Sequence, residues 1–576
     1  MTILDYIQEI FIYNPSKPLI FTRFYFWAFF AIVLLGYSLV YKNNKRSMRS
    51  AYLFAVSIFF YYKSSGLFFF ILLFSTVTDY YIGKAIYDSN KLLIRRLLIA
   101  LSLIVNLSLL VYFKYSYFLT LSINEMFNTN FEVVNLMAQL ANNATGSHFD
   151  VDKILLPVGI SFYTFQTISY SIDIYRKEVK PVNNIIDFGF YVSFFPQLVA
   201  GPIVRAAQFI PQMYEEYKLS KAEFGLALFW IMKGLVKKIF IGDYIAVNFV
   251  DRVFSAPLSY SGFENLAALF GYSLQVYMDF AGYTDIAIGV ALLLGFRLPK
   301  NFNSPYKAQN VGDFWKRWHI SLSTWLKDYL YIPMGGNRGG SIFSYIMLTI
   351  ILLFITLLTG IWWLFPIFYI VGIILAIFMR KSKNFAKHIN TNINLMLTML
   401  IGGLWHGASW QFIIWGGLNG LGLVVYKYWR KISPWENSQK TIAVVWKIAI
   451  TFSFITFTRV FFRSESMEVV NGMLHQIGLL LPSLSDFSNI VSNTDTIVFI
   501  QQWALIPGII IAYKWVFVIM MTGFVFHWLP YSLKDNYRNW YINLNFYLKA
   551  FIFALVVFIV YQSISSEMVA FIYFQF

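Results

Sequence analysis

Long apolar runs alternate with short polar or basic segments along most of this chain. A helix needs about 20 apolar residues to cross a bilayer. Runs of that kind, or close to it, occur at about 23–41, 51–62, 66–83, 97–119, 155–175, 222–254, 264–296, 341–360, 361–379 and 442–463, with two or three more before the end. The pattern predicts an all-α, polytopic integral membrane protein with roughly 11–14 transmembrane or re-entrant helices.

The polar segments divide the chain into four parts. Residues 1–120 are predicted to form N-terminal transmembrane helices, and the Asn-rich residues 121–153 an extramembrane loop. Residues 154–475 form the core that carries the motifs described below, and residues 476–576 form a C-terminal loop and further transmembrane helices. No internal repeat at a fixed period is visible.

Two local patterns refine this picture. Residues 194–203 contain two prolines and a glycine inside apolar sequence, which predicts a re-entrant or discontinuous element buried in protein. The basic loops at 42–49 and 380–383 are predicted to be cytoplasmic, because cytoplasmic loops of membrane proteins are enriched in Lys and Arg.

Composition supports the membrane class and excludes several others. The chain has 58% hydrophobic and only 13% charged residues, with a mean hydropathy of +0.60, which rules out an ordinary soluble domain. The absence of cysteine excludes disulfides, thiolate catalysis and Cys-based metal sites. The formal charge of +17 comes from short clusters between apolar runs. This distribution predicts the lipid bilayer, and not nucleic acid, as the partner of these charges.

One histidine lies deep inside apolar sequence. The nearest cationic residues to His406 are Lys387 and Lys427, and no acidic residue lies between them. This segment is too long for one crossing, so we expect it to fold back near 416–420. An ionisable side chain at membrane depth is a candidate functional group. The alternative is a structural histidine that bonds two helices together.

A second histidine lies in the most polar interior region. Asp313 suits the start of a helix, and Pro333 with the glycines after it suits the end. On one continuous helix the spacing places Trp315, Trp318, His319 and Leu322 on a single face, with Lys316, Arg317 and Lys327 on the other side. The pattern predicts an interfacial amphipathic helix with His319 turned inward.

The intramembrane carboxylates Asp279 and Asp285 are six residues apart. They differ by about 240° around a helix and so do not share a face. We therefore expect structural pairing with basic groups, and not a paired acid and base. The remaining histidines show no ligand spacing, so no metal site is predicted.

The two inward histidines fit one kind of chemistry. Acyl transfer to a hydroxyl needs a base for the hydroxyl proton and donors for the developing oxyanion. A neutral imidazole supplies the base, and Trp, Asn or a second imidazole can supply the donors.

At these residues the sequence resembles the membrane-bound O-acyltransferase (MBOAT) family, in particular its bacterial, AlgI-like polysaccharide O-acetyltransferase branch. The resemblance rests on residues 194–202, 275–289, 301–306, 314–336, 403–410 and 459–464, in the order typical of the family. It covers about residues 155–475, so residues 154–475 are interpreted as the MBOAT catalytic core.

The resemblance implies helices arranged around a central funnel, with His406 and His319 as catalytic residues. Trp315, Lys316, Arg317, Trp405 and Asn337 become candidates for donor binding or funnel lining. His406 would act as general base or as a transient acyl carrier. The donor would be acetyl-CoA or another acyl thioester, with no bound cofactor.

The implied reaction moves an acetyl group from a cytoplasmic thioester to an extracytoplasmic hydroxyl of a cell-surface or secreted polysaccharide. The acceptor is the polysaccharide or a partner acetyltransferase protein, and the location is the bacterial cytoplasmic (inner) membrane. Two alternatives stay open: D-alanyl transfer, and a non-enzymatic polysaccharide export or transport component. The ending at 331–338 favours acetyl transfer, and the lack of repeated halves counts against a transporter.

Overall fold

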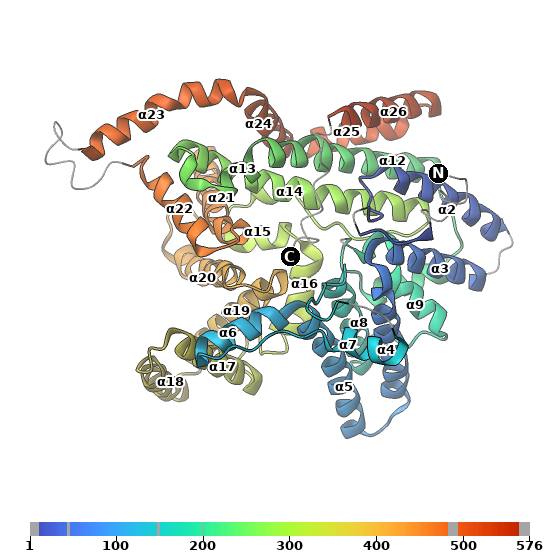
Figure 1. Ribbon diagram of the computed structural model, residues 1–576, viewed down its shortest axis with the longest axis horizontal. Helices are drawn as coiled ribbons and strands as arrows, with labels where there is room; N and C mark the ends of the chain where they lie inside the picture. Colours follow the sequence, from blue (N-terminus) through green and yellow to red (C-terminus); the bar gives the residue numbers. More distant parts are fainter. Residues whose placement is uncertain are drawn as a thin grey trace. The chain divides into compact units, whose positions relative to one another are not determined.

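A computed structural model of the chain describes residues 11–15, 17–42, 46–146, 150–199, 201–481 and 494–563. All regular elements in these residues are helices, and no β-strand occurs among them (Figure 1). The prediction of an all-α protein is confirmed.

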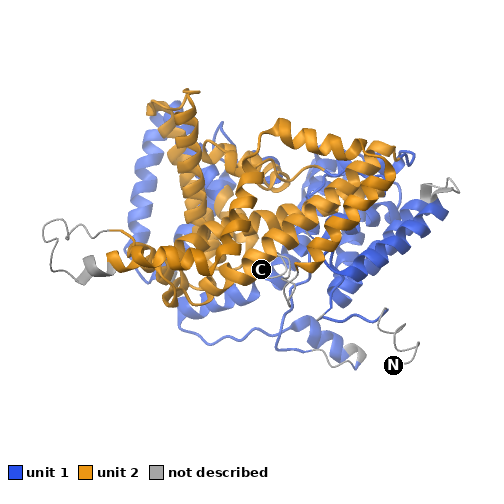
Figure 2. Cartoon of the chain, turned by 90° about the horizontal axis from the view of Figure 1, so that it is seen from above, with its two compact units in different colours: residues 1–218, 294–298, 325–397 blue, residues 219–293, 299–324, 398–576 orange. Residues whose placement is uncertain are grey.

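The chain forms two compact units, each made of separate sequence segments (Figure 2). Unit 1 comprises residues 1–218, 294–298 and 325–397, and unit 2 comprises 219–293, 299–324 and 398–576. Both units take residues from the predicted core at 154–475, whose extent as a functional domain stays a prediction.

Unit 1 is built from the N-terminal helices and two later apolar ones. Its helices are α2 (Phe24–Lys42), α3 (Arg46–Ser65), α4 (Phe69–Asp88), α5 (Leu92–Leu110), α6 (Ser116–Phe127), α7 (Leu136–Thr145), α8 (Ile160–Tyr175), α9 (Ile185–Ser193), α10 (Phe195–Leu198), α11 (Ala206–Tyr214), α17 (Ile342–Thr359), α18 (Leu364–Lys381) and the first part of α19 (Lys383–His406).

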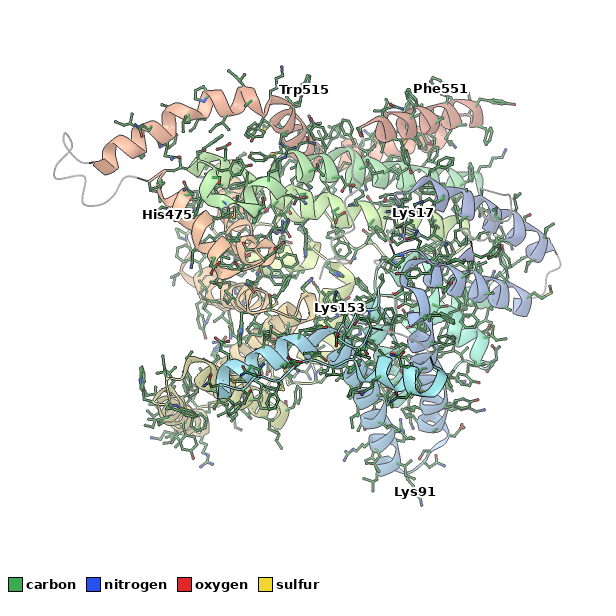
Figure 3. All side chains as sticks on the ribbon, viewed as in Figure 1. Lys17, Lys91, Lys153, His475, Trp515 and Phe551 are labelled. Atoms are coloured by element: carbon green, nitrogen blue, oxygen red, sulfur yellow. The ribbon has the colours of Figure 1, made fainter. Side chains whose placement is uncertain are left out.

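Short helical segments join these elements: η1 (Gly66–Phe68) and η7 (Lys327–Tyr331) lie in unit 1, as does η2 (Val111–Tyr115) between α5 and α6. Lys91 marks the turn between the long helices α4 and α5 (Figure 3). The segment 121–153, expected to be a loop, contains the end of α6 and all of α7. Its extramembrane position stays a prediction.

Unit 2 contains the longest helix, α14 (Gly262–Leu293), and the C-terminal helices. Its other elements are α12 (Lys221–Leu235), η3 (Val236–Asp243), η4 (Ala246–Val250), α13 (Asp251–Ser255), η5 (Pro257–Ser259), η6 (Pro305–Lys307), α15 (Val311–Arg317), most of α16 (Ile320–Leu326), α20 (Trp410–Ile432), α21 (Thr441–Arg463), α22 (Met467–Gly478), α23 (Thr494–Ala512), α24 (Lys514–Trp528), α25 (Tyr531–Asn543) and α26 (Phe546–Gln562).

Several helices are long and apolar enough to cross a membrane. In the described residues they number 5, or up to 7 if each of two bent helix pairs is one span. The bent pairs are α23 with α24, at 85°, and α25 with α26, at 120°. Shorter apolar helices, such as Ile342–Leu357, add to these. The protein is therefore a polytopic membrane protein, in which many apolar segments are broken by turns.

The discontinuity expected near Pro196 is present in unit 1. The helix α9 ends at Ser193, Phe194 leaves the helical conformation, and the short α10 begins at Phe195. Every residue from 188 to 199 is buried. Broken backbone with buried surroundings is the arrangement that membrane proteins tolerate.

The helices α12 and α14 of unit 2 lie side by side (Figure 1). They approach closely at Gly234 and Gly282, where an added methyl group on either residue would meet the backbone of the other helix. Small residues allow this kind of close helix packing in membranes. The contact brings lysines of α12 and η3 next to the carboxylates of α14.

These carboxylates pair with lysines, as expected. The Asp285 carboxylate lies 2.8 Å from Lys237 Nζ and 3.2 Å from Lys233 Nζ. The Asp279 carboxylate lies 2.6 Å from the buried Lys238 Nζ, which also contacts Asp243 at 2.6 Å. The expected pairing with basic groups is thus present, with different lysines for the two aspartates, while their purely structural function stays a prediction.

Candidate active site

His406 is the last residue of α19, and α20 begins at Trp410. The chain therefore turns at 407–409, and the fold-back expected near 416–420 is wrong. The glycines there lie inside α20, where Gly416 packs against Gly403 of α19: a methyl group on Gly403 would meet the Phe412 carbonyl and would lie 3.0 Å from Gly416 Cα. Gly416 thus serves close helix contact, and not a turn.

The His406 side chain is buried, with 2% of its surface exposed. Aromatic rings surround it: the centroid distances are 5.0 Å to Trp405, 5.1 Å to Trp415 and 5.3 Å to Phe462. All three contacts are edge-on, which is favourable for aromatic rings. This packing gives the imidazole a fixed and largely apolar environment.

His319 lies at a break between two short helices. The continuous helix expected from Asp313 to Pro333 is wrong, because α15 ends at Arg317, Trp318 is extended with φ −103° and ψ 130°, and α16 begins at Ile320. His319 itself has φ +43°, in the left-handed region. Asn310, and not Asp313, caps α15, and Asp313 is in its first turn.

Backbone hydrogen bonds from residues 301–303 hold this break. The Asn303 N–H donates to the Arg317 carbonyl at 2.9 Å, and the Ile320 N–H donates to the Asn301 carbonyl at 2.9 Å. A bulky residue in the left-handed region is strained and persists only where its surroundings enforce it. The segment 301–303 supplies that support.

Asn301 also orients the His319 ring. Its side-chain Oδ1 accepts from the Ser321 N–H at 3.1 Å and from the Ser321 hydroxyl at 3.0 Å, which fixes the amide orientation. The same Oδ1 lies 3.2 Å from His319 Nδ1. The proton of the neutral ring is therefore on Nδ1, and Nε2 is the basic nitrogen.

Burial also sets the protonation state of His319. The side chain is fully buried, and desolvation lowers its pKa to about 3. The imidazole is neutral at physiological pH. A neutral ring whose proton is on Nδ1 presents Nε2 as a proton acceptor.

The two predicted catalytic histidines belong to one site. Their ring centroids are 6.4 Å apart, and both rings contact Trp405, at 5.9 Å from His319 and 5.0 Å from His406. Residues that are 87 positions apart in sequence thus meet around one indole. Their function in catalysis is argued below as a proposal.

A small cavity of about 20 Å³ adjoins His406. This space holds about one water-sized group. Most of its wall is apolar or aromatic, with three polar residues: His406, Asn419 and Arg459. The full lining is Val276, Phe280, Phe314, Trp318, His406, Trp415, Asn419, Ile455, Arg459 and Phe462.

The polar residues of this cavity have defined contacts. Arg459, 4% exposed, has its guanidinium 4.5 Å from the Trp318 ring centroid and donates to the Ser273 carbonyl at 2.9 Å and to the Tyr306 hydroxyl. Asn419 donates through Nδ2 to the Trp415 carbonyl at 2.9 Å, and its Oδ1 accepts no hydrogen bond from the described residues. A hydroxyl entering the cavity would find an acceptor in this oxygen.

The predicted donor-binding residues fall into different places. Trp405 contacts both histidine rings, and Trp315 contacts Trp415 at a centroid distance of 5.7 Å. Lys316 is exposed, whereas Arg317 pairs with Asp313 at 2.9 Å and donates to the Tyr531 hydroxyl at 3.0 Å.

Asn337 belongs to unit 1, where its Oδ1 accepts from the Tyr331 hydroxyl at 2.6 Å. Its function in a funnel stays a prediction. Among the described residues, no group of three or more His, Asp or Glu side chains could hold a metal ion.

Sequence reasoning missed three residues of the site: Asn301, Asn419 and Arg459. Asn301 and Arg459 lie in stretches that carry the family resemblance, but nothing in their spacing indicates a neighbour. Asn419 lies in the segment mistaken for a turn. A buried arginine or asparagine in an apolar run is the one signal that could have identified them.

Comparison with known proteins agrees with these observations. The MBOAT, membrane-bound O-acyltransferase family matches residues 51–381. A peptidoglycan O-acetyltransferase of Helicobacter pylori is 33% identical over 495 residues, covering 81% of each chain. The probable alginate O-acetylase AlgI of Pseudomonas aeruginosa is 35% identical over 455 residues, covering 78% of this chain and 73% of its own.

A teichoic acid D-alanyltransferase of Bacillus subtilis is 29% identical over 322 residues, covering 54% of this chain and 69% of its own. An alignment that covers 81% of this chain necessarily includes its central part, where His319 and His406 lie. The family match extends over more than half of the chain. The chain therefore belongs to the membrane-bound O-acyltransferase family, and it is an O-acyltransferase.

Proposed function

We propose that this protein is an O-acetyltransferase of the bacterial cytoplasmic membrane. It takes an acetyl group from a cytoplasmic thioester such as acetyl-CoA and delivers it to an extracytoplasmic hydroxyl of a polysaccharide, directly or through a partner acetyltransferase protein. The observation that carries the proposal is the pair of buried histidines, whose ring centroids are 6.4 Å apart and of which His406 lines a cavity of hydroxyl size.

In the proposed reaction His406 is the general base. The acceptor hydroxyl enters the cavity and its oxygen attacks the thioester carbonyl, while its proton moves to the imidazole of His406. The carbon–sulfur bond then breaks, and the leaving thiolate takes that proton. The products are an acetyl ester and a free thiol.

The other polar groups have supporting functions in this scheme. Arg459 supplies positive charge near the developing oxyanion. The Asn419 Oδ1 accepts a hydrogen bond from a neighbouring hydroxyl of the acceptor, because the proton of the attacking hydroxyl goes to His406. His319 and Trp405 orient the thioester next to His406. Preorganised donors in a water-poor site are worth more than in water, because solvent does not screen them.

The relatives favour acetyl over D-alanyl transfer. The relatives named for O-acetylation match at 33–35% identity over about four fifths of this chain, whereas the D-alanyltransferase matches at 29% over 54%. The acceptors named for those relatives are peptidoglycan and alginate, and both are polysaccharide polymers. A hydroxyl-rich extracytoplasmic glycan is accordingly the acceptor class proposed here.

The test compares His406→Ala with His475→Ala in membranes that contain equal amounts of folded protein. His475 is an exposed histidine of α22 (Figure 3) and provides the matched control. With labelled acetyl-CoA, we expect His406→Ala to lose about 10²-fold or more of the alkali-labile label in the glycan, because a general base contributes that much. His475→Ala should equal the wild type.

Two outcomes would change the proposal. Undiminished acetylation by His406→Ala would remove His406 from the mechanism. Acid-quenched wild-type protein that carries label on His406 would assign the transient acyl-carrier function instead. A parallel assay with D-alanyl-loaded carrier protein decides between the two acyl groups.

A further inference from the structure

A second and larger cavity lies in unit 2, next to α12, α14 and the C-terminal helices α24 and α25. Its volume is about 240 Å³. The residues 300–304 form one wall, and most other lining side chains are polar, charged or aromatic. The described lining is Phe229, Trp230, Lys233, Lys237, Ile241, Tyr277, Met278, Asp285, Ile288, Lys300, Asn301, Phe302, Asn303, Ser304, Phe526, His527, Tyr531, Lys534, Asp535, Tyr537 and Arg538.

Positive charge exceeds negative charge in this cavity. Five cationic side chains line it, against the carboxylates of Asp285 and Asp535, and Arg538 pairs with Asp535 at 3.0 Å. Asp285 is shared by Lys233 and Lys237. Lys300 and Lys534 have no carboxylate within ion-pair distance in the described part of the chain. This excess of cations gives the cavity a positive potential.

Contacts with the Trp230 ring and hydrogen bonds position the lysine side chains of this cavity. Lys233 Nζ lies 4.2 Å and Lys300 Nζ 5.9 Å from the Trp230 ring centroid. Lys534 Nζ donates to the Ser304 hydroxyl at 3.1 Å and to the His527 carbonyl at 2.6 Å. These contacts fix the ammonium groups without neutralising them, which leaves the cavity suited to an anion.

Two of the residues that line the cavity carry a buried N–H donor without an acceptor among the described residues. His527 is 3% exposed, and its Nε2 accepts from the Tyr306 N–H at 3.2 Å, so the ring proton is on Nδ1. Neither this Nδ1 nor the Asn301 Nδ2, whose residue is 1% exposed, has a hydrogen-bond partner in the described residues. Buried donors without acceptors are rare, and a bound group or an ordered water usually satisfies them.

We propose that this cavity binds a phosphate-bearing anion. Phosphate oxygens accept several hydrogen bonds at once and carry the charge that clustered lysines attract. The phosphate comes from one of two sources, the coenzyme part of the acyl donor or the headgroup of an anionic lipid. The first source rests on the proposed function, whereas the anion site itself does not.

Asn301 connects this site to the histidines. Its Oδ1 holds Nδ1 of His319 at 3.2 Å, while its Nδ2 is among the donors of the anion cavity. A phosphate that accepts a hydrogen bond from Nδ2 would push electron density onto Oδ1 of the amide and strengthen the hydrogen bond to His319. Occupation of the anion site would therefore make His319 more basic.

The test measures binding to the purified full-length protein without turnover. The probes are coenzyme A and inorganic pyrophosphate in detergent, and nanodiscs of phosphatidylglycerol compared with phosphatidylcholine. The variants are Lys300→Gln and His527→Gln. Glutamine at 527 keeps an acceptor for the Tyr306 N–H but removes the Nδ1 donor. Lys514→Gln is the control, because Lys514 also lies 5.9 Å from a tryptophan ring but lines no part of this cavity.

We expect coenzyme A to bind the wild type and pyrophosphate to compete with it. Each test variant should raise the dissociation constant about tenfold, the usual effect of losing one charge-assisted hydrogen bond, and Lys514→Gln should leave it unchanged. If only phosphatidylglycerol nanodiscs raise the melting temperature, and the test variants abolish that rise, the phosphate belongs to a lipid headgroup.

Three results would overturn the anion site: a wild type that responds to none of the probes, test variants that bind as tightly as the wild type, or an equal loss in Lys514→Gln. Failure of the proposed acetyl-transfer function can be distinguished from failure of the anion site. A protein that binds coenzyme A through Lys300 but transfers no acetyl group keeps the anion site and rejects the reaction.

Discussion

His319 and His406 reach the same site by different local means. His406 ends a regular helix and is held by rings on three sides. His319 lies where two short helices fail to join, and a carboxamide fixes its tautomer. The first arrangement positions a side chain by packing, and the second positions it by hydrogen bonds and backbone conformation.

Burial of His319 makes the stability of the protein depend on pH. Its pKa falls to about 3 in the folded state, whereas an unfolded histidine titrates near 6.5. As pH falls below about 6.5, the unfolded state binds the proton first, so stability present above that pH is lost, at about 1.4 kcal/mol per pH unit. At pH 5 the loss is about 2 kcal/mol.

The variant His319→Asn isolates this effect, because asparagine tolerates the left-handed region and does not titrate. We expect the melting-temperature difference between wild type and variant, measured in detergent from pH 7.5 to 5, to change in favour of the variant as pH falls. A difference that stays constant over this range would contradict a neutral, buried His319.

Sequence identified both histidines but not the groups that orient them. An imidazole in apolar sequence is conspicuous, because ionisable residues there are rare. The Asn301 side chain reaches His319 because backbone hydrogen bonds pair residues 301–303 with residues 317–320. Such pairing depends on tertiary contact, and it leaves no periodic pattern in the residues themselves.

At the scale of helices, the close contact between α19 and α20 depends on Gly403. A side-chain methyl group there would overlap the Phe412 carbonyl, whereas one on Gly417 would make an ordinary contact, 3.5 Å from Leu400 Cδ2. We expect Gly403→Ala to cost about 1–3 kcal/mol and to reduce acetyl transfer, since His406 follows three residues later.

Gly417→Ala is the matched control for Gly403→Ala. It should be neutral or stabilise the helix by up to about 1 kcal/mol. Thermal unfolding in detergent and the acetyl-transfer rate are the two measurements. Equal melting temperatures for the two variants would mean that the helices separate easily at Gly403.

The length of the apolar runs predicted most helices, and the mispredicted segments have physical causes. The runs at 264–296, 361–379 and 442–463 became α14, α18 and α21 with ends within about three residues. The break at Trp318 contains neither Pro nor Gly, so no local signal marks it. The glycines at 416–420 resemble a turn, but a partner helix lies against them.

For the whole molecule, the absence of cysteine allows a direct test of topology. The exposed Ser382 lies between α18 and α19, in the basic loop predicted to be cytoplasmic. The exposed Ile361 lies at the other end of α18, a candidate span. In Ser382→Cys, an impermeant maleimide should label only from the cytoplasmic side, and in Ile361→Cys only from outside.

The wild-type protein gives the background level of maleimide labelling for both variants, because it contains no cysteine. Labelling of both positions from the same side would show that α18 does not cross the membrane. Labelling of Ser382→Cys from outside alone would invert the predicted orientation. The donor would then have to approach from the opposite side of the bilayer.

The left-handed backbone of His319 is a conformation that glycine would adopt without strain. Glycine adopts φ +43° freely, whereas a residue with a Cβ is strained there by about 1–2 kcal/mol. Both His319→Gly and His319→Ala should be inactive, yet the glycine variant should resist unfolding better than the alanine variant by about that amount. Backbone strain of this kind is typical of functional sites, which agrees with the function proposed for His319.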